Sequence, residues 1–294
     1  MIDKLHLSEV QIDNIIGLAL DEDICHGDIT SEALIPHHLD GKAIIMTKEE
    51  GTLAGMLVVS RIFFRIDPSL KVKVLVQDGT RVKHGDVIAS VSGRIISILK
   101  GERTALNFLQ RMSGIASLTA RYVAETHCFK ANIYDTRKTT PGLRALEKYS
   151  VRMGGGKNHR LNLGDNILIK DNHLASLRNL RMSLKDIIDR SRQNIPKGVT
   201  VEIEVTTTEE ALEALEAGAD IIMLDNMSTD EMTRVAGLIA GRAKIEASGG
   251  ITLDNVRQVA ETGVDIISIG ALTHSYKALD ISLEINRQAL NSPS

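Results

Sequence analysis

The stretch EALEAGADIIMLDN (213–226) is echoed in outline by QVAETGVDIISIGA (258–271). In each, a helical pattern leads to a glycine, Gly218 or Gly263, and then to an Asp-Ile-Ile run of the kind that forms a buried strand. The two glycines lie 45 residues apart with one further strand-like run between them, so the repeated unit is one helix and one strand. Such units predict parallel strands joined by right-handed crossovers.

Six strand-like runs of this type lie between residues 132 and 270. They are IYDTR (133–137), ILIKDN (167–172), VEIEVTT (201–207), IIMLDN (221–226), KIEASGG (244–250) and IISIGA (266–271). A closed barrel of eight βα units usually needs about 200 residues or more. This segment is shorter, so we expect a barrel with fewer strands or an open one. Of the 294 residues, 43% are hydrophobic but only 3% aromatic, which suits the aliphatic interior of such a barrel.

The first hundred residues follow a different pattern. Short β-like runs at 42–49, 70–77 and 87–99 are separated by glycine turns, which predicts a small, mostly antiparallel sheet with helices. From Lys100 the pattern becomes helical, as one or two helices with a possible break at Gly114. This part of the chain therefore reads as an α+β unit that leads into the βα repeats.

The charge is unevenly distributed. The net charge of −3 gives no reason to expect nucleic acid or a membrane as a partner. Residues 135–173, however, carry eight Lys/Arg against four Asp/Glu, a local +4 that leaves −7 for the rest. This basic island predicts a site for a small anion, with a solvated basic face as the alternative. Asn158 follows Gly156-Lys157 where a P-loop needs Ser or Thr, so an ATP site of that type is not expected.

The carboxyl ends of parallel strands form the active site in βα folds, and here those ends carry charge. Arg137, Lys138 and Lys170 follow the first two strands, and His159 and Arg160 precede the second. Because an arginine offers a planar fork suited to carboxylates, these cations predict a pocket for an anionic substrate.

Acidic and glycine residues end the later strands. Glu204 and Asp225 are candidates for binding Mg²⁺ or sugar hydroxyls, with surface acids as the alternative. The turns at 248–250 and Gly270 are candidates for binding phosphate through backbone N–H groups, with simple turn glycines as the alternative. A helix expected near Thr252 would add partial positive charge there.

Longer stretches carry a resemblance to a known family. The chain resembles the quinolinate phosphoribosyltransferases, also called nicotinate-nucleotide pyrophosphorylases (carboxylating), in EDICHGDITSEALIP (22–36), GERTALNFLQRMSGIA (101–116), DTRKTTPGLRALEKYSVRMGGGKNHRLNLGDNILIKDNH (135–173), VEIEV (201–205), IIMLDN (221–226), EASGGI (246–251) and IGALTHS (269–275). The resemblance covers nearly the whole chain. It implies an α/β protein with an N-terminal open-faced α/β sandwich (1–112), to which a C-terminal tail (275–294) returns, and an incomplete, six-stranded α/β barrel (113–274).

The resemblance also implies a reaction and a set of site residues. Quinolinate and 5-phosphoribosyl-1-pyrophosphate would give nicotinate mononucleotide, pyrophosphate and CO₂, with Mg²⁺, in de novo NAD biosynthesis. By the resemblance, Arg137, His159 and Arg160 would bind the quinolinate carboxylates, together with Arg103 from the partner subunit of a homodimer. Lys138 and Lys170 would bind substrate and pyrophosphate charge, and Glu204 and Asp225 would bind the ribose hydroxyls and Mg²⁺. The 5-phosphate would be bound by Ser248, Gly249, Gly250 and Gly270. Lys138, Lys170, Glu204 and Asp225 are the expected catalytic residues.

Two alternatives remain open at this point. One is another phosphoribosyltransferase of the same architecture, acting on nicotinate or in molybdenum-related metabolism, although a mono-carboxylate needs fewer cations. The other is a carrier module, because residues 78–99 echo the hairpin of biotinyl and lipoyl carriers; we favour a structural hairpin there. The start of the chain lacks the pattern of a secretory signal and no run reaches the ~18 apolar residues of a membrane span, so the cytoplasm is the expected location.

Overall fold

The computed structural model describes residues 9–194, 196 and 198–286. Over these residues the chain forms two compact units. Unit 1 is drawn from Met1–Ala120, Thr139–Gly155 and Thr273–Ser294, and unit 2 from Arg121–Lys138 and Gly156–Leu272. Each unit is thus assembled from pieces that are distant in sequence. The domain division expected after residue 112 stays a prediction.

Unit 1 contains a four-stranded antiparallel sheet in the order β12-β1-β5-β3. Its strands are β1 (Asp40–Thr47), β3 (Lys71–Val74), β5 (Val87–Arg94) and β12 (Ile281–Ile285). A second sheet pairs β2 (Gly51–Thr52) with β4 (Arg81–Val82). The helices are α1 (Glu9–Ile24), α2 (Ile29–Leu34), α3 (Met56–Ile66), most of α4 (Ile95–Thr126) and α5 (Arg144–Met153). β12 belongs to the expected tail 275–294, of which residues 287–294 lie outside the described residues.

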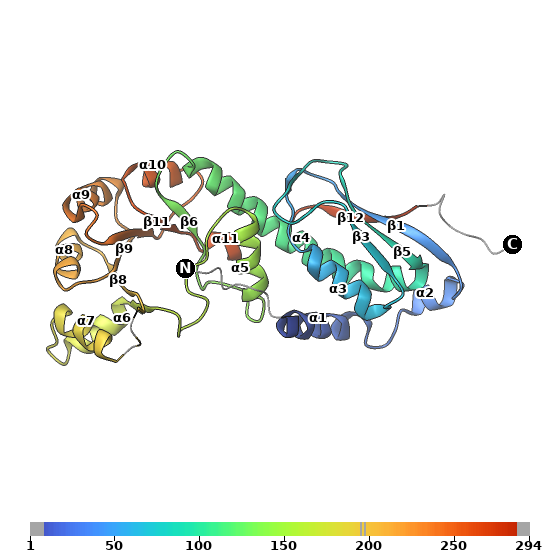
Figure 1. Cartoon of the computed structure of the whole chain (residues 1–294), viewed down its shortest axis with the longest axis horizontal. Coiled ribbons are helices and arrows are strands. Elements are labelled where there is room, and N and C mark those ends of the chain that lie inside the picture. The colour runs from blue at the N-terminus through green and yellow to red at the C-terminus, as the bar shows by residue number, and fades with distance from the viewer. Residues whose placement is uncertain (1–8, 195, 197, 287–294) are drawn as a thin grey trace. The chain divides into compact units, whose positions relative to one another are not determined.

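One face of the four-stranded sheet is buried. Along β1, Ala43 and Ile45 are fully buried, whereas Lys42 is exposed and Ile44 only half-buried. Because side chains alternate along a strand, every second residue of β1 joins one core with residues of α1, α3 and α4. Figure 1 shows α3 and α4 running beside this sheet. The expected mostly antiparallel sheet with one covered face is confirmed.

Two boundaries in unit 1 differ from the expectation. The run 87–99 is not one strand, because β5 ends at Arg94 and α4 begins at Ile95. Gly114 does not break the helix, since α4 is continuous over 32 residues. A Cβ atom at Gly114 would lie 2.3 Å from the carbonyl oxygen of Lys277, so close packing of a second segment requires glycine there. β4 and β5 belong to different sheets, so residues 78–99 form neither the structural hairpin favoured from the sequence nor the hairpin of a carrier module.

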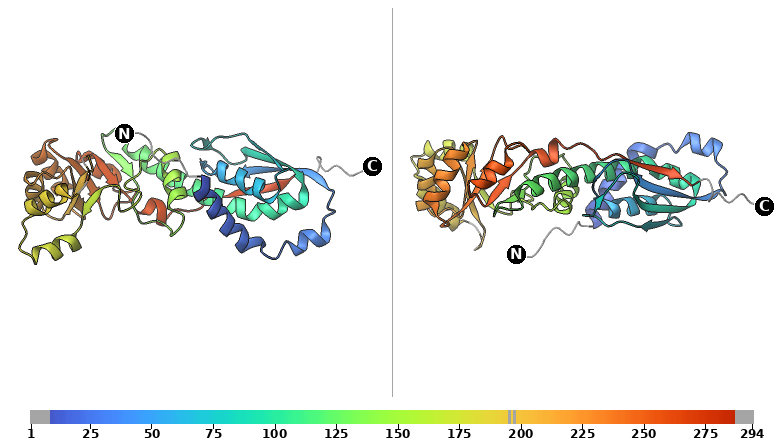
Figure 2. Two further views of the ribbon diagram at one scale, coloured as in Figure 1. Left: turned by 60° about the horizontal axis from the view of Figure 1, so that its bottom comes forward. Right: turned by 90° about the horizontal axis from the view of Figure 1, so that it is seen from above.

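Unit 2 contains a parallel sheet of six strands in the order β6-β11-β10-β9-β8-β7. The strands are β6 (Asn132–Tyr134), β7 (Ile167–Ile169), β8 (Val201–Val205), β9 (Ile221–Asp225), β10 (Lys244–Ser248) and β11 (Ile266–Ser268). The helices that follow these strands are α6 (Asp171–Arg178), α7 (Leu184–Gln193), α8 (Thr208–Glu216), α9 (Thr229–Ile239), α10 (Val256–Glu261) and α11 (Ala271–His274), of which the last two residues of α11 belong to unit 1. In Figures 1 and 2, the helices α8–α10 lie along one side of the strands.

The barrel of unit 2 is incomplete. In the described part of the chain β6 pairs with β11 but not with β7, so the ring of strands is left open between its first two members. The expectation of six strands in an open α/β barrel is therefore confirmed.

The Asp of the repeated Asp-Ile-Ile motif has a structural role in this sheet. Asp220 precedes β9, and its Oδ2 accepts the backbone N–H of Val201 at the start of β8, at 2.8 Å. Asp265 precedes β11, and its Oδ2 accepts the backbone N–H of Ile245 in β10, at 2.9 Å. Each carboxylate fixes the start of a neighbouring strand, so the sequence repeat is also a repeat of this contact.

Candidate active site

The carboxyl ends of the six strands of unit 2 surround a cavity of about 610 Å³. Ten of the twelve predicted site residues line it, namely Arg137, Lys138, His159, Arg160, Lys170, Glu204, Asp225, Ser248, Gly249 and Gly250. Gly270, which follows β11, is not among the lining residues. Arg103 belongs to unit 1 and lies within α4 rather than at the start of a helix. The roles expected of these two residues stay predictions.

A short segment on the open edge of β6 brings His159 and Arg160 to the cavity. The N–H of Lys157 donates to the carbonyl of Ile133 at 2.8 Å, and the N–H of Asp135 donates to the carbonyl of Lys157 at 3.1 Å. Lys157 thereby forms an isolated parallel bridge with Tyr134. The carbonyl of Tyr134 accepts the N–H of Ile269, the residue after β11, on the opposite edge. The segment occupies the edge of β6 that β7 does not reach.

Two guanidinium groups face the same space. Burial lowers the pKa of Arg160, and the nearby charge of Arg137 lowers it further. Both side chains are half-buried. Two like charges held this close in a cavity repel each other, and an anion with two negative groups would relieve that repulsion. On the same rim, Lys170 is paired with Glu204 through an Nζ–Oε2 contact of 2.8 Å.

His159 stands over two buried acids. Its Nε2 lies 3.1 Å from Oε2 of Glu202 and 3.5 Å from Oε2 of Glu246, and both glutamates are almost fully buried. Burial lowers the pKa of His159, but the hydrogen bonds with the two carboxylates outweigh it and raise the pKa to about 10. Burial also raises the pKa of Glu202, to about 7, against the opposing effect of His159. The protonation of His159 and that of Glu202 therefore depend on each other.

The Nδ1 atom of His159 accepts the backbone N–H of Arg160 at 2.9 Å. Full protonation of the ring would break this hydrogen bond. The backbone contact therefore favours the neutral ring of His159, whereas the two carboxylates favour the charged ring. His159, Glu202 and Glu246 also bring three potential ligand atoms within 4.8 Å of one another, a spacing that could hold a metal ion if the ring gave up its Nε2 proton.

Glu204 and Asp225 form a second set of potential ligands, and their carboxylate oxygens suit a magnesium ion. Glu204 is the next-to-last residue of β8 and Asp225 the last residue of the adjacent strand β9, and both line the cavity. Mg²⁺ is usually held by one or two carboxylates together with substrate phosphates, and an all-oxygen donor set is the one it prefers. The two carboxylates, in a cavity that cations also line, therefore fit Mg²⁺.

The glycine turn after β10 is fixed by backbone geometry. Gly249 has φ +90°, and a Cβ atom on it would lie 2.3 Å from Oδ1 of Asn226. Gly250 has φ +62° with open space around the Cβ position. Both therefore favour glycine, and Gly249 the more strongly. The helix expected near Thr252 was placed too early: α10 begins at Val256 because residues 253–255 form a turn first.

Part of the cavity lining was not predicted from the sequence. Six further residues line the cavity: Thr136, Leu168, Met223, Asn226, Glu246 and Ser268. Strand alternation could have found Glu246, which lies two residues before Ser248 in β10 and therefore on the same face. Its pairing with His159 had no signal in the sequence, because the two residues belong to distant segments.

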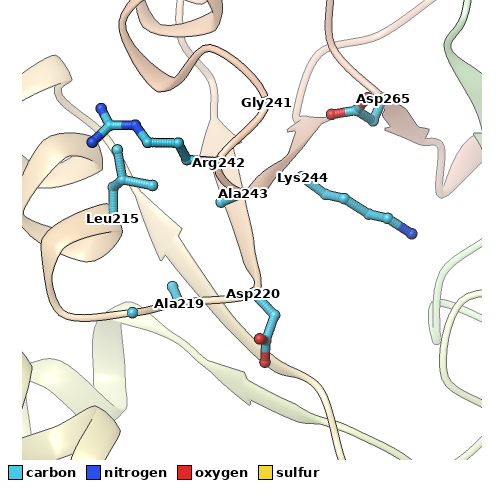
Figure 3. A pocket seen from close by; sticks show the side chains of 9 residues that line it. Leu215, Ala219, Asp220, Gly241, Arg242, Ala243, Lys244 and Asp265 are labelled. Atoms are coloured by element: carbon cyan, nitrogen blue, oxygen red, sulfur yellow. The ribbon is translucent and has the colours of Figure 1, made fainter.

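A second cavity, of about 510 Å³, lies at the opposite ends of the same strands. Figure 3 shows Asp220, Lys244 and Asp265 beside it. Asp220 and Asp265 are bound to strand starts, and Arg242 donates to the carbonyls of Leu238 and Ile239 at the end of α9. The polar groups here mostly serve the fold.

The chain matches two family models. These are the quinolinate phosphoribosyl transferase N-terminal domain, over residues 28–113, and the C-terminal domain, over residues 115–284. The probable nicotinate-nucleotide pyrophosphorylase (carboxylating) of Bacillus subtilis (strain 168) is 41% identical over 279 residues, which covers 95% of this chain and 95% of that protein. The protein of the same name from Synechocystis is 42% identical over 271 residues, covering 91% and 90%.

Solved structures agree with these relatives. NadC from Streptococcus pyogenes superimposes with a TM-score of 0.90 at 42% identity, covering 95% of this chain and 99% of that one. Human nicotinic acid phosphoribosyltransferase gives a TM-score of 0.60 at 11% identity, a likeness of fold alone. By both domain models and by its relatives, this chain belongs to the quinolinate phosphoribosyltransferase family.

Proposed function

We propose that the chain transfers the phosphoribosyl group of 5-phosphoribosyl-1-pyrophosphate to quinolinate, with loss of CO₂, to give nicotinate mononucleotide and pyrophosphate. One observation carries the proposal: cations for a dianion, two acids and a glycine turn all line one cavity. The names of relatives that share more than 40% of their residues with this chain support the same activity.

The quinolinate carboxylates are assigned to the arginine side of the cavity. Arg137 and Arg160 offer planar forks, and their mutual repulsion is relieved when two carboxylates bind. His159 is assigned to the same side because its backbone joins it to Arg160. Arg103 of the partner subunit in a homodimer is proposed to complete this set.

The phosphoribosyl donor is assigned to the remaining side. Gly249 and Gly250 let the backbone approach the 5-phosphate. Ser248 directly precedes them, and Gly270, which follows β11, is assigned to the same phosphate. Glu204 and Asp225 are assigned to the ribose hydroxyls and Mg²⁺. When bound, the ion would neutralise charge on the pyrophosphate.

The chemistry needs charge held in place more than it needs a base. The pyridine nitrogen attacks the ribosyl carbon as its bond to pyrophosphate breaks, and Lys138 and Lys170 are proposed to stabilise the departing negative charge. The nitrogen then carries a positive charge. The C–C bond to the adjacent carboxylate breaks, its electron pair stays on the ring carbon beside N⁺, CO₂ leaves and that carbon takes up a proton.

The activity is tested by giving the purified protein quinolinate or nicotinate with 5-phosphoribosyl-1-pyrophosphate. Release of both pyrophosphate and CO₂ with quinolinate, and of neither with nicotinate, is the expected result. Pyrophosphate released with nicotinate alone would instead identify a nicotinate phosphoribosyltransferase.

The homodimer is tested by complementation. Arg103→Ala and Arg137→Ala are each expected to be nearly inactive, and mixing them should form heterodimers with one intact site each. Because half of randomly mixed dimers are heterodimers, about a quarter of wild-type sites should return. No recovery after verified subunit exchange would place both residues in the site of one chain.

A further inference from the structure

Asp135 lies at the junction of β6 and the cavity, yet its carboxylate is fully buried and does not line the cavity. It follows the last residue of β6 and precedes Thr136 and Arg137, which do line it. A buried carboxylate is costly unless several donors satisfy it. Its partners therefore indicate what it is for.

Two of those partners belong to the segment that occupies the open edge of β6. Oδ1 of Asp135 accepts the backbone N–H of His159 at 2.9 Å, and Oδ2 accepts Nδ2 of Asn158 at 2.6 Å. The backbone N–H of Asp135 also donates to the carbonyl of Lys157 at 3.1 Å. Three consecutive residues are thus bound to this one aspartate, immediately before Arg160.

The two backbone contacts at the edge of β6 described above both involve Lys157. Its bridge with Tyr134 is isolated and does not extend into a strand. The two carboxylate contacts bind the next two residues, so they act on the part of the chain that leads directly to Arg160. A carboxylate that accepts two hydrogen bonds holds a segment more strongly than a neutral acceptor does.

We propose that Asp135 is a positioning residue, whose carboxylate directs the 158–160 segment so that Arg160 stands beside Arg137 in the cavity. This inference rests on the proposed function, in which those two arginines bind the quinolinate carboxylates. It explains how a barrel that is open between β6 and β7 still places cations at that opening.

The test reverses donor and acceptor. In Asp135→Asn, the amide NH₂ replaces one of the two accepting oxygens. It then faces another donor, either the N–H of His159 or Nδ2 of Asn158, and that hydrogen bond is lost. We expect the KM for quinolinate to rise about 10-fold, with the KM for the phosphoribosyl donor changed much less. In the double variant Asp135→Asn/Asn158→Asp, the new amide donates to the new carboxylate and still accepts from His159. Quinolinate affinity should recover in large part.

Asp265→Asn is the matched control, because Asp265 also accepts a backbone N–H in unit 2 but at the opposite ends of the strands. It should leave both KM values unchanged. Calorimetric titration with quinolinate gives a readout independent of turnover. An unchanged quinolinate affinity in Asp135→Asn, or an equal loss for both substrates that the double variant does not reverse, would overturn the proposal.

Two further variants keep the outcomes distinct. If Asp135→Asn does not fold, Asn158→Ala removes one of the two donors and should still weaken quinolinate selectively; no such loss overturns the proposal. If Arg160→Lys leaves quinolinate affinity intact, the carboxylate role of Arg160 fails. A quinolinate-selective loss in Arg160→Lys without one in Asp135→Asn rejects only the role of Asp135.

Discussion

At the amino ends of β8–β11 the aspartates are bound to the sheet itself, whereas at the carboxyl ends the acids face a cavity lined by cations. Asp265 accepts a strand N–H at 2.9 Å and pairs with Lys130 at 3.0 Å. Glu204 pairs with Lys170 inside the cavity at 2.8 Å. The two ends of one sheet therefore use the same chemical group for different purposes.

The backbone explains this difference. Strand starts of a parallel sheet present N–H groups, which are donors that a carboxylate can satisfy. Strand ends present carbonyl groups, which a carboxylate cannot bond. An acid at a carboxyl end must find a side-chain cation, a loop N–H or a ligand instead. The same asymmetry leaves these ends available for binding substrates and ions.

The strongest test of the contrast removes an acid from the cavity. Glu204→Ala and Asp225→Ala should each lower kcat by about 100-fold or more, because ribose and Mg²⁺ placement would fail. Steady-state kinetics at saturating substrates measure this effect. Turnover that persists in EDTA without added metal would contradict the magnesium part of the assignment.

A second test changes the shape of a cation without changing its charge. Arg160→Lys should lose about 10- to 100-fold in kcat/KM for quinolinate, since the planar fork is lost. The affinity for the phosphoribosyl donor should change much less. Varying each substrate in turn separates the two effects, and an equal loss for both would reject Arg160 as a carboxylate ligand.

A third test concerns the glycine turn after β10. Gly249→Val should raise the KM for the phosphoribosyl donor about 10-fold, because φ +90° disfavours a side chain that would also press on Asn226. Gly250→Ala is the milder comparison, since open space surrounds its Cβ position. Unchanged donor affinity in both folded variants would remove this turn from the phosphate site.

The smallest kinetic effect is expected at the amino ends. Asp265→Ala should leave kcat and both KM values unchanged but lower stability by about 1–2 kcal/mol, since the N–H of Ile245 loses its acceptor. A fall in Tm of about 2–8 °C follows from that value. Thermal unfolding measures it. A large loss of activity at unchanged Tm would mean that the amino ends take part in catalysis after all.

The local pattern predicted much of this structure. The spacing of Gly218 and Gly263 indicated βα units, and all six strands of unit 2 were located from their apolar runs. Because side chains alternate and strand ends are polar, ten of the predicted residues could be assigned to one cavity. The boundaries of some elements were predicted less accurately than their existence. No local pattern marks the change from strand to helix at Ile95 or the start of α10 at Val256.

The sequence by itself determined the periodicity of the elements and which chemical groups stand at their ends, because both depend on residues a few positions apart. Only the tertiary structure decided which strands are neighbours. It placed the opening of the barrel between β6 and β7, seated Lys157 on the edge of β6 and set His159 over Glu202 and Glu246. These contacts join residues more than twenty positions apart, and the packing of the whole unit fixes them where no local pattern can.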